Sequence, residues 1–472
     1  MSENPENHPT NRPNYQTSQP KHVTPSTDHG SIVSRRTIDR DIRRLALPSL
    51  GSLLAEPLLI AVDSAMVGHL GTVPLAGLAL ASTVLTTLVG MCIFLAYATT
   101  AATARLFGAG KRKEAFSQGI DGMWLALGLG ALLAILLIVI ARPFLGIFGP
   151  EADVLEQSVL YLRSSSFGLP GMLLVLAATG TLRGMGDTRT PLYAATAGAL
   201  LNIPLNYLLI YPAGLGIFGA GAGTALAQTF MGLWLGSVVL RSARREGAAL
   251  TPSGAGVLRS LRDAGPLIVR TLSLRGAILL QIAAATGLGT QALASNQITM
   301  TVWNFAAYGL DALATAAQIL VGQGLGSGSR ERVRAVLARC LNRGAVYGAF
   351  LGVGLAALSW LIPTFMTQDP AVRALATHSL WIAAAALPIA SVAYMLDGVL
   401  IGAGDTRKLA TYMLTALAIF APAALAVMQW GRGEAGLLAL WAAYAVLFMA
   451  VRGGTMLLRS RGEAWMRLGE RR

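Results

Sequence analysis

Two carboxylates, Glu56 and Asp63, are the residues of this sequence best placed to do chemistry, because both lie in a stretch that is otherwise apolar. They are seven residues apart, so a helix would carry both on one face, about 10 Å from each other. A carboxylate near the middle of a bilayer costs about 2.5–3.5 kcal/mol on insertion scales, so one that persists usually faces a cavity or a partner. Pro48 and Pro57 lie in the same stretch, where each permits a bend. The pattern indicates a moving helix that binds a proton; the alternative for either acid is a fixed structural hydrogen bond.

Three polar residues further along the chain are candidate partners for Asp63. Asn202 and Asn206 are four residues apart and would stack on one helix face. Thr224 lies among small residues, which let membrane helices approach closely. Their amides and hydroxyl can hydrogen-bond Asp63 in its protonated or its ionised form. Hydrogen bonding between helices, without any role in transport, explains the two asparagines equally well.

The second half of the chain has its own ionisable residues in apolar segments. Arg275 and Asp311 each fall near the middle of a segment, and pairing is the least costly way to keep both. We predict that they form a structural ion pair; the alternative is a direct role in substrate or ion coupling. Asp397 lies toward the end of a later segment. With Glu56, these three residues are the candidates for lining a substrate cavity.

Helices that cross a membrane must position these residues. Hydrophobic residues make up 54% of the chain and charged residues 13%, about half the charged share of a soluble domain. Apolar stretches recur near the length of about 20 residues that a spanning helix needs. We expect an all-α membrane protein with about twelve spans. The predicted segments are 45–67, 73–100, 122–142, 159–182, 190–212, 215–240, 264–287, 291–322, 341–364, 376–401, 408–430 and 434–456.

The chain is an internal duplication. Gly-Asp-Thr-Arg occurs at 186–189 and again at 404–407, an offset of 218 residues. The same offset matches other residues without any insertion: Pro48 with Pro266, Gly71 with Gly289, Gly108 with Gly326, Arg112 with Arg330, and Pro170 with Pro388. Duplicated apolar halves indicate two lobes of six helices each, with a site between or within them. The expected division is a disordered tail at 1–38, lobes at 39–245 and 263–458, a linker at 246–262, and a basic tail at 459–472.

The net charge of +14 is spread over alternate loops and does not form one basic face. Basic residues precede the first segment and follow the even-numbered ones, whereas the loop after the third segment carries Glu151, Asp153 and Glu156. This pattern places both termini in the cytoplasm of a cell-membrane protein and argues against nucleic acid as a partner.

Enzyme, cofactor and metal motifs are not indicated. Gly214, Gly216 and Gly219 have dinucleotide-fingerprint spacing, but they fall between two membrane segments. Cys92 and Cys340 lie in or beside apolar segments, and the histidines of the first tail are scattered. We expect no catalytic residues, no metal and no cofactor.

The sequence resembles the multidrug and toxic compound extrusion (MATE) family, most closely its DinF-like branch. The resemblance covers about residues 40–456 and is carried by Glu56–Gly71, by the two Gly-Asp-Thr-Arg loops, by Val321–Gly326 and by Leu396–Gly402. It implies a monomer whose two six-helix bundles rock between states and expel organic cations or amphiphilic compounds in exchange for protons or sodium. It also implies that Asp63 is the coupling residue, supported by Asn202, Asn206 and Thr224.

Two departures from the family pattern bear on the coupling ion. Relatives commonly carry Asp where this chain has Asn206, and often Glu where it has Gln318. The missing carboxylate disfavours a sodium site in the first lobe, so proton coupling is expected, with sodium as the alternative.

Two other functions are alternatives. A flippase for a lipid-linked intermediate would favour a basic cavity, and Arg275 is the only basic residue that the sequence places deep in a span. A scaffold that transports nothing would not need acids within the membrane.

The charge pattern predicts which side of the membrane each loop occupies. A cysteine replacing Gln157 should react with an impermeant maleimide in intact cells, because the acidic loop is expected outside. The parent chain without Cys92 and Cys340 is the control for background labelling. Labelling only after permeabilisation would reverse the orientation.

Overall fold

The computed structural model describes residues 35–469, apart from the side chain of Glu56. Residues 1–34 of the predicted first tail lie outside this range, and the described residues contain helices and no strand. The helices of the first half are α1 (Arg35–Gly68), α2 (Thr72–Met91), α3 (Phe94–Gly108), α4 (Arg112–Gly146), α5 (Ala152–Ser166), α6 (Leu169–Gly184), α7 (Arg189–Ile210) and α8 (Gly216–Arg245).

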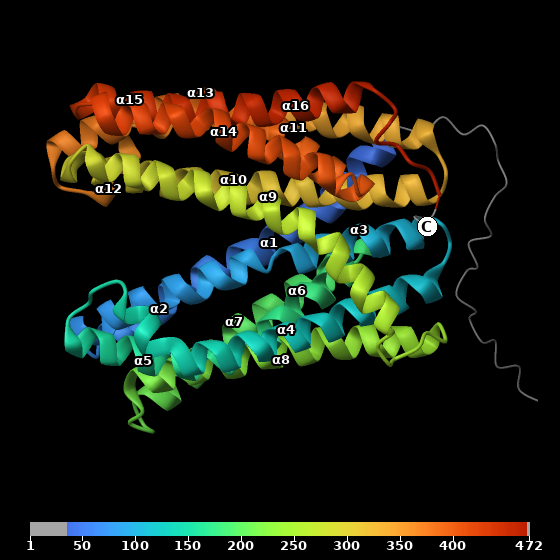
Figure 1. Cartoon of the computed structure of the whole chain (residues 1–472), viewed down its shortest axis with the longest axis horizontal. Helices are drawn as coiled ribbons and strands as arrows, with labels where there is room; N and C mark the ends of the chain where they lie inside the picture. Colours follow the sequence, from blue (N-terminus) through green and yellow to red (C-terminus); the bar gives the residue numbers. More distant parts are fainter. Residues whose placement is uncertain (1–34, 470–472) are drawn as a thin grey trace, which may run out of the picture.

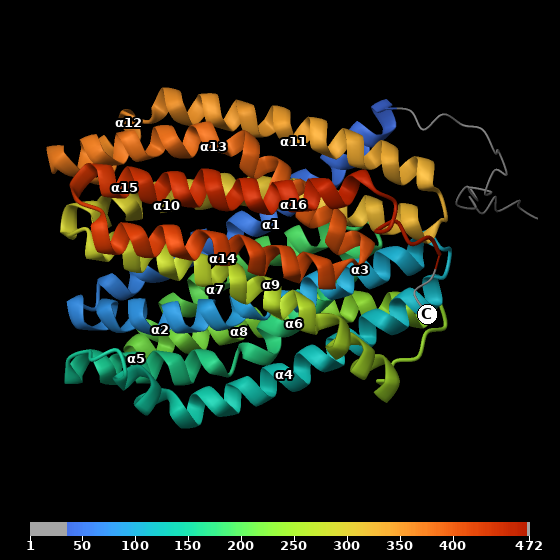
Figure 2. The ribbon, with the colours of Figure 1, turned by 45° about the horizontal axis from the view of Figure 1, so that its top comes forward.

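The second half is also helical, and its first helix begins inside the segment expected to be a linker. Its elements are α9 (Gly254–Gly287), α10 (Thr290–Gly326), α11 (Arg330–Leu358), α12 (Leu361–Met366), α13 (Pro370–Ala403), α14 (Thr406–Trp430), α15 (Gly433–Trp441), the π-helical η1 (Ala442–Phe448) and α16 (Met449–Arg461). Figure 1 shows the two halves as two bundles, blue to green and yellow to red, and Figure 2 shows their helices running along one common axis.

The expected number of spans is confirmed. Eleven helical segments of the described chain are long and apolar enough to cross a membrane, and a twelfth is the pair α5 and α6, which is bent by 49°. Two of the eleven are made of more than one element: α2 and α3 together form Thr72–Gly108, and α15, η1 and α16 form Gly433–Arg461. Each of the twelve predicted segments corresponds to one of these spans.

Small residues let equivalent helices pack closely in the two halves. A Cβ atom at Gly180 of α6 would collide with the backbone of Ala96 in α3. At the equivalent positions, a Cβ at Gly398 of α13 would collide with the backbone of Ala314 in α10. Only glycine permits such an approach, as in membrane helix pairs generally. The duplication read from the sequence is therefore repeated in the packing.

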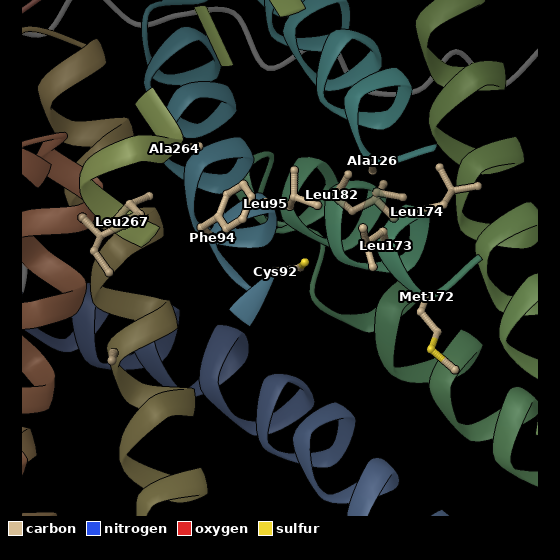
Figure 3. Packing of buried hydrophobic residues seen from close by; sticks show 14 of the residues in the cluster. Cys92, Phe94, Leu95, Ala126, Met172, Leu173, Leu174, Leu182, Ala264 and Leu267 are labelled. Carbon is tan, nitrogen blue, oxygen red and sulfur yellow. The ribbon is translucent and has the colours of Figure 1, made fainter. Parts of the chain in front are cut away.

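A hydrophobic cluster crosses from one bundle to the other. Phe94 and Leu95 of α3 and Ala264 and Leu267 of α9 are all nearly inaccessible and belong to this cluster. Figure 3 shows Phe94 and Leu95 between the α9 pair on one side and Leu182 of α6 on the other. Packing of this kind holds the two halves together along the inner parts of α3 and α9.

Two equivalent glycines make a close contact between the halves. Gly326 at the end of α10 lies against the backbone of Arg105 in α3, and Gly108 at the end of α3 lies against the backbone of Gln323 in α10. Nearby, Arg343 of α11 forms an ion pair with Asp39 of α1, with Nη2 and Oδ2 2.6 Å apart. These contacts close one end of the seam between the bundles, the end where the basic loops lie.

The segment after α16, part of the basic tail expected at 459–472, lies over this closed end. Trp465 is only 1% exposed, and the backbone N–H of Gly469 donates to the carbonyl of Leu325 at 3.1 Å. Arg105 donates through Nε to the carbonyl of Gly469 at 2.7 Å and through Nη1 to that of Ala403 at 3.2 Å. Residues 462–469 thus connect α3 of the first half to α10 of the second.

This closed seam predicts a specific cross-link. A Cβ atom at Gly322 would lie 2.9 Å from the Cβ of Ala104, and a disulfide needs a Cβ separation of about 3.5–4.5 Å, which is a small adjustment. The double variant Ala104→Cys/Gly322→Cys, with Cys92 and Cys340 replaced by serine, should cross-link in most molecules on mild oxidation. After cleavage at a protease site inserted in 247–253, the halves should stay together on a non-reducing gel.

The control pairs Ala104→Cys with Gly354→Cys, because a Cβ at Gly354 would meet nothing within 4 Å. Cross-linking of the control pair, or none in the test pair, would contradict the closed seam.

Candidate functional site

Asp63 lies at the centre of a small hydrogen-bonded group formed by three helices of the first half. Its carboxylate is 6% exposed. Asn206 of α7 donates through Nδ2 to Asp63 Oδ1 at 2.6 Å, and Thr224 of α8 donates through Oγ1 to Oδ2 at 3.3 Å. The same Nδ2 lies 3.2 Å from the side-chain oxygen of Asn202. The structure therefore brings together the four residues that the sequence had grouped.

The local sequence explains how three helices converge on one carboxylate. Asn202 and Asn206 lie one turn apart on α7, and Gly223 of α8 has no Cβ to displace the Asn206 amide. This lets α8 approach until the next residue, Thr224, reaches Asp63. The expected hinges Pro48 and Pro57 both lie inside α1, which is a continuous helix in this state.

A cavity of about 250 Å³ extends from this group toward the second half of the chain. Asp63, Asn202 and Thr224 contribute to one part of its wall; Tyr97, Arg183 and Asp311 contribute to another. Most of the remaining lining is apolar, for example Leu59, Val89, Met172, Leu176 and Met231. Such a surface suits an amphiphilic molecule, with a few polar groups to orient it.

The predicted ion pair between Arg275 and Asp311 is wrong. The two described side chains make no salt bridge: Asp311 lines the cavity, whereas the Arg275 guanidinium extends against Gly90 of α2. The count of residues along a span gives the depth of a side chain, but not its direction around the helix axis. Arg275 and Asp311 can therefore lie at equal depth in the membrane without contact between their side chains.

Asp397 pairs with two arginines that the sequence had not singled out. Arg270 of α9 pairs with it, with Nε 3.3 Å from Oδ1, and Arg452 of α16 places Nη2 3.1 Å from Oδ2. All three residues are at most 5% exposed. The Arg270 guanidinium also lies 5.3 Å from the ring centre of Tyr97, and that of Arg452 lies 4.8 Å from the ring centre of Tyr394.

Arg275 is therefore not the only basic residue deep in the protein. Arg270 and Arg452 fall inside the predicted segments 264–287 and 434–456, so their positions were visible in the sequence and their importance was missed. Arg183 follows the fourth predicted segment, where the charge pattern predicts a loop, but it lies in the last turn of α6. Neither Arg275 nor Asp397 lines the cavity around Asp63, and the side chain of Glu56 lies outside the described residues.

The buried triad predicts a large loss of stability when its acid is neutralised. Asp397→Asn leaves two arginines without a countercharge, and breaking a buried pair in this way costs about 3–5 kcal/mol. We expect a clearly lower melting temperature in detergent. The control is Glu246→Gln, which removes an exposed pair with Arg112 (3.6 Å) and should change stability by less than about 1 kcal/mol. Equal effects of the two variants would contradict this interpretation.

Comparison with known proteins places the chain in a family. The MatE family model matches twice, at residues 48–208 and 266–425, which covers both halves. DNA damage-inducible protein F of Escherichia coli is 33% identical over 429 residues, covering 88% of this chain and 90% of that protein. Protein DETOXIFICATION 43 of Arabidopsis thaliana is 29% identical over 490 residues, covering 91% of each chain.

Solved structures agree on the fold. The Vibrio cholerae MATE transporter VcmN in its bent form superposes with a TM-score of 0.82 at 21% identity, covering 92% of this chain and 98% of the other. An outward-facing MATE transporter gives 0.82 at 20% identity, covering 91% and 96%. The repeated family match, the full-length relatives and the twelve-span fold together show that this chain is a multi-pass membrane transporter, not an enzyme, and belongs to the MATE family of multidrug and toxic compound extrusion proteins.

Proposed function

We propose that the protein exports organic cations or amphiphilic compounds in exchange for protons, by alternating access. The observation that carries this proposal is a buried carboxylate, Asp63, held by two hydrogen-bond donors in the wall of a largely apolar cavity. Proton uptake removes one negative charge from that wall. A substrate that binds better to the ionised cavity would then be released when Asp63 is protonated. Antiport follows if proton and substrate favour opposite states of the protein.

The state described by the structure fits one half of such a cycle. The contacts of Gly108 and Gly326 and the Asp39–Arg343 ion pair close the end that carries the basic loops. If that end is cytoplasmic, the cavity in this state is shut from the inside. Return to the other state requires these contacts to part, with α1 free to bend at Pro48 or Pro57.

The orientation of the Asn206 amide supports protons over sodium as the coupling ion. Its Nδ2 faces the oxygens of Asp63 and Asn202, whereas its own Oδ1 is buried without a partner. Sodium would need several oxygens directed at one point, including a fixed charge. Here Asn206 directs a donor at Asp63, as suits a carboxylate that gains and loses a proton.

We place the protein in the cell membrane as a monomer surrounded by lipid, with both termini in the cytoplasm. Figure 2 shows the beginning of α1 and the end of α16 at the same end of the molecule. The basic residues of the intervening loops gather there too, as the positive-inside pattern requires for a cytoplasmic side.

Transport by purified protein in liposomes tests this function. With sodium absent, a pH gradient should drive movement of a fluorescent organic cation, and Asp63→Asn should reduce its rate by about tenfold or more, because the variant keeps the shape and loses the titrating group. The control Asp153→Asn, at the start of α5 and outside the cavity, should keep the rate.

Two outcomes would redirect the proposal. Transport that needs sodium and does not respond to pH would show that sodium, not the proton, is the coupling ion. Undiminished pH-driven transport by Asp63→Asn would remove Asp63 from the coupling step.

A further inference from the structure

Arg183 is the cavity residue that the proposed function leaves unused. It lies in the last turn of α6 and lines the cavity together with Asp63 and Asp311. Its Nε is buried without a hydrogen-bond partner. Among the described residues, its guanidinium makes no salt bridge, not even with Asp311 in the same cavity.

The other deep arginines show how unusual this is. Arg270 and Arg452 share the carboxylate of Asp397, and each lies over a tyrosine ring. A guanidinium at membrane depth is expensive unless it is paired or faces water. Among the described residues, Arg183 forms no such ion pair and lies over no ring, although Asp311 and Tyr97 are near enough to act on its charge. Its guanidinium faces the cavity of about 250 Å³.

Guanidinium chemistry indicates which ligand would complete the site. The group is planar, always charged, and carries five N–H donors in a fork that matches the two oxygens of a carboxylate. The rest of the cavity is mostly apolar and contains the acids Asp63 and Asp311. A molecule that matches these features has an acidic group and an apolar body, and it can carry a positive charge near Asp63 or Asp311.

We propose that Arg183 binds an anionic group of the transported substrate, so that the preferred substrates are amphiphilic carboxylates or zwitterions, not simple cations. This inference rests on the proposed function, because it assigns the substrate class of the same cavity. The charge of Arg183 does not change during the cycle, whereas that of Asp63 does. Arg183 therefore sets which compounds bind, and Asp63 sets when they leave.

A matched pair of dyes tests this proposal. A rhodamine with a free carboxyl group and its methyl ester share the cationic ring system and differ in one negative charge. The purified wild-type protein should bind the free acid about tenfold more tightly than the ester, a ratio equal to about 1.4 kcal/mol, because only the acid can form a charge-assisted bidentate pair. Fluorescence anisotropy gives both dissociation constants without any transport.

Variants of Arg183 assign the preference to its side chain. Arg183→Gln should bring the ratio of the two constants close to one by weakening the acid, and leave the ester within about twofold, since only the acid meets the guanidinium. Arg183→Lys should retain part of the preference. The control is Arg163→Gln, because Arg163 donates to the carbonyl of Ile138 outside the cavity and should leave the ratio unchanged.

Equal binding of the two dyes to the wild type would overturn the proposal, even if no variant folds. A preference that survives in folded Arg183→Gln would overturn it too. The proposed function fails separately: loss of proton coupling shows in the response of transport to Asp63→Asn and to pH, whereas the dye ratio is an equilibrium measurement that needs neither.

Discussion

The close approach of α3 and α10 is the constraint on which the rest of this structure depends. The two helices meet through Gly108 and Gly326, which are equivalent by the internal duplication, and each glycine lies on the backbone of the other helix. Side chains larger than hydrogen at these positions would hold the bundles apart. The closed seam between the bundles, the cavity next to it and the path of residues 462–469 all depend on this contact.

The ionisable residues within the membrane fall into two groups with different physical roles. Asp397 forms ion pairs with Arg270 and Arg452, and all three residues are buried in the second half. These pairs connect α9, α13 and α16. Asp63 and Arg183 instead face a cavity. The first half thus contains most of the charged groups that line the cavity, and the second half contributes Asp311 to it and holds a separate buried charged cluster. The duplicated halves thus share one fold but differ in the arrangement of their buried charged residues.

Much of this could be predicted from the sequence, because hydropathy and spacing are local properties. The twelve spans and the repeat came from segment length and offset, whereas the grouping of Asp63 with Asn206 and Thr224 came from their hydrogen-bonding capacity and from the resemblance to the MATE family. The pairing of Arg270 and Arg452 with Asp397 did not. Which neighbour a buried side chain meets depends on the rotation of each helix about its axis and on the order in which helices pack. A single sequence contains no direct record of either, and for that reason the predicted contact between Arg275 and Asp311 is wrong.

The segment at 462–469 lies across the closed seam and contacts both halves of the protein. It is fixed to the second half by Leu325 and by the ion pair of Glu463 with Arg330 (3.3 Å), and it reaches the first half through Arg105. When the seam opens, this segment can stay bound to only one of the two halves. The hydrogen bonds of Arg105 to the carbonyls of Gly469 and Ala403 join residues of opposite halves, so they must be exchanged for bonds to water. Opening would therefore wet a guanidinium that is now 6% exposed, and hydration of this one side chain would mark which way the protein faces.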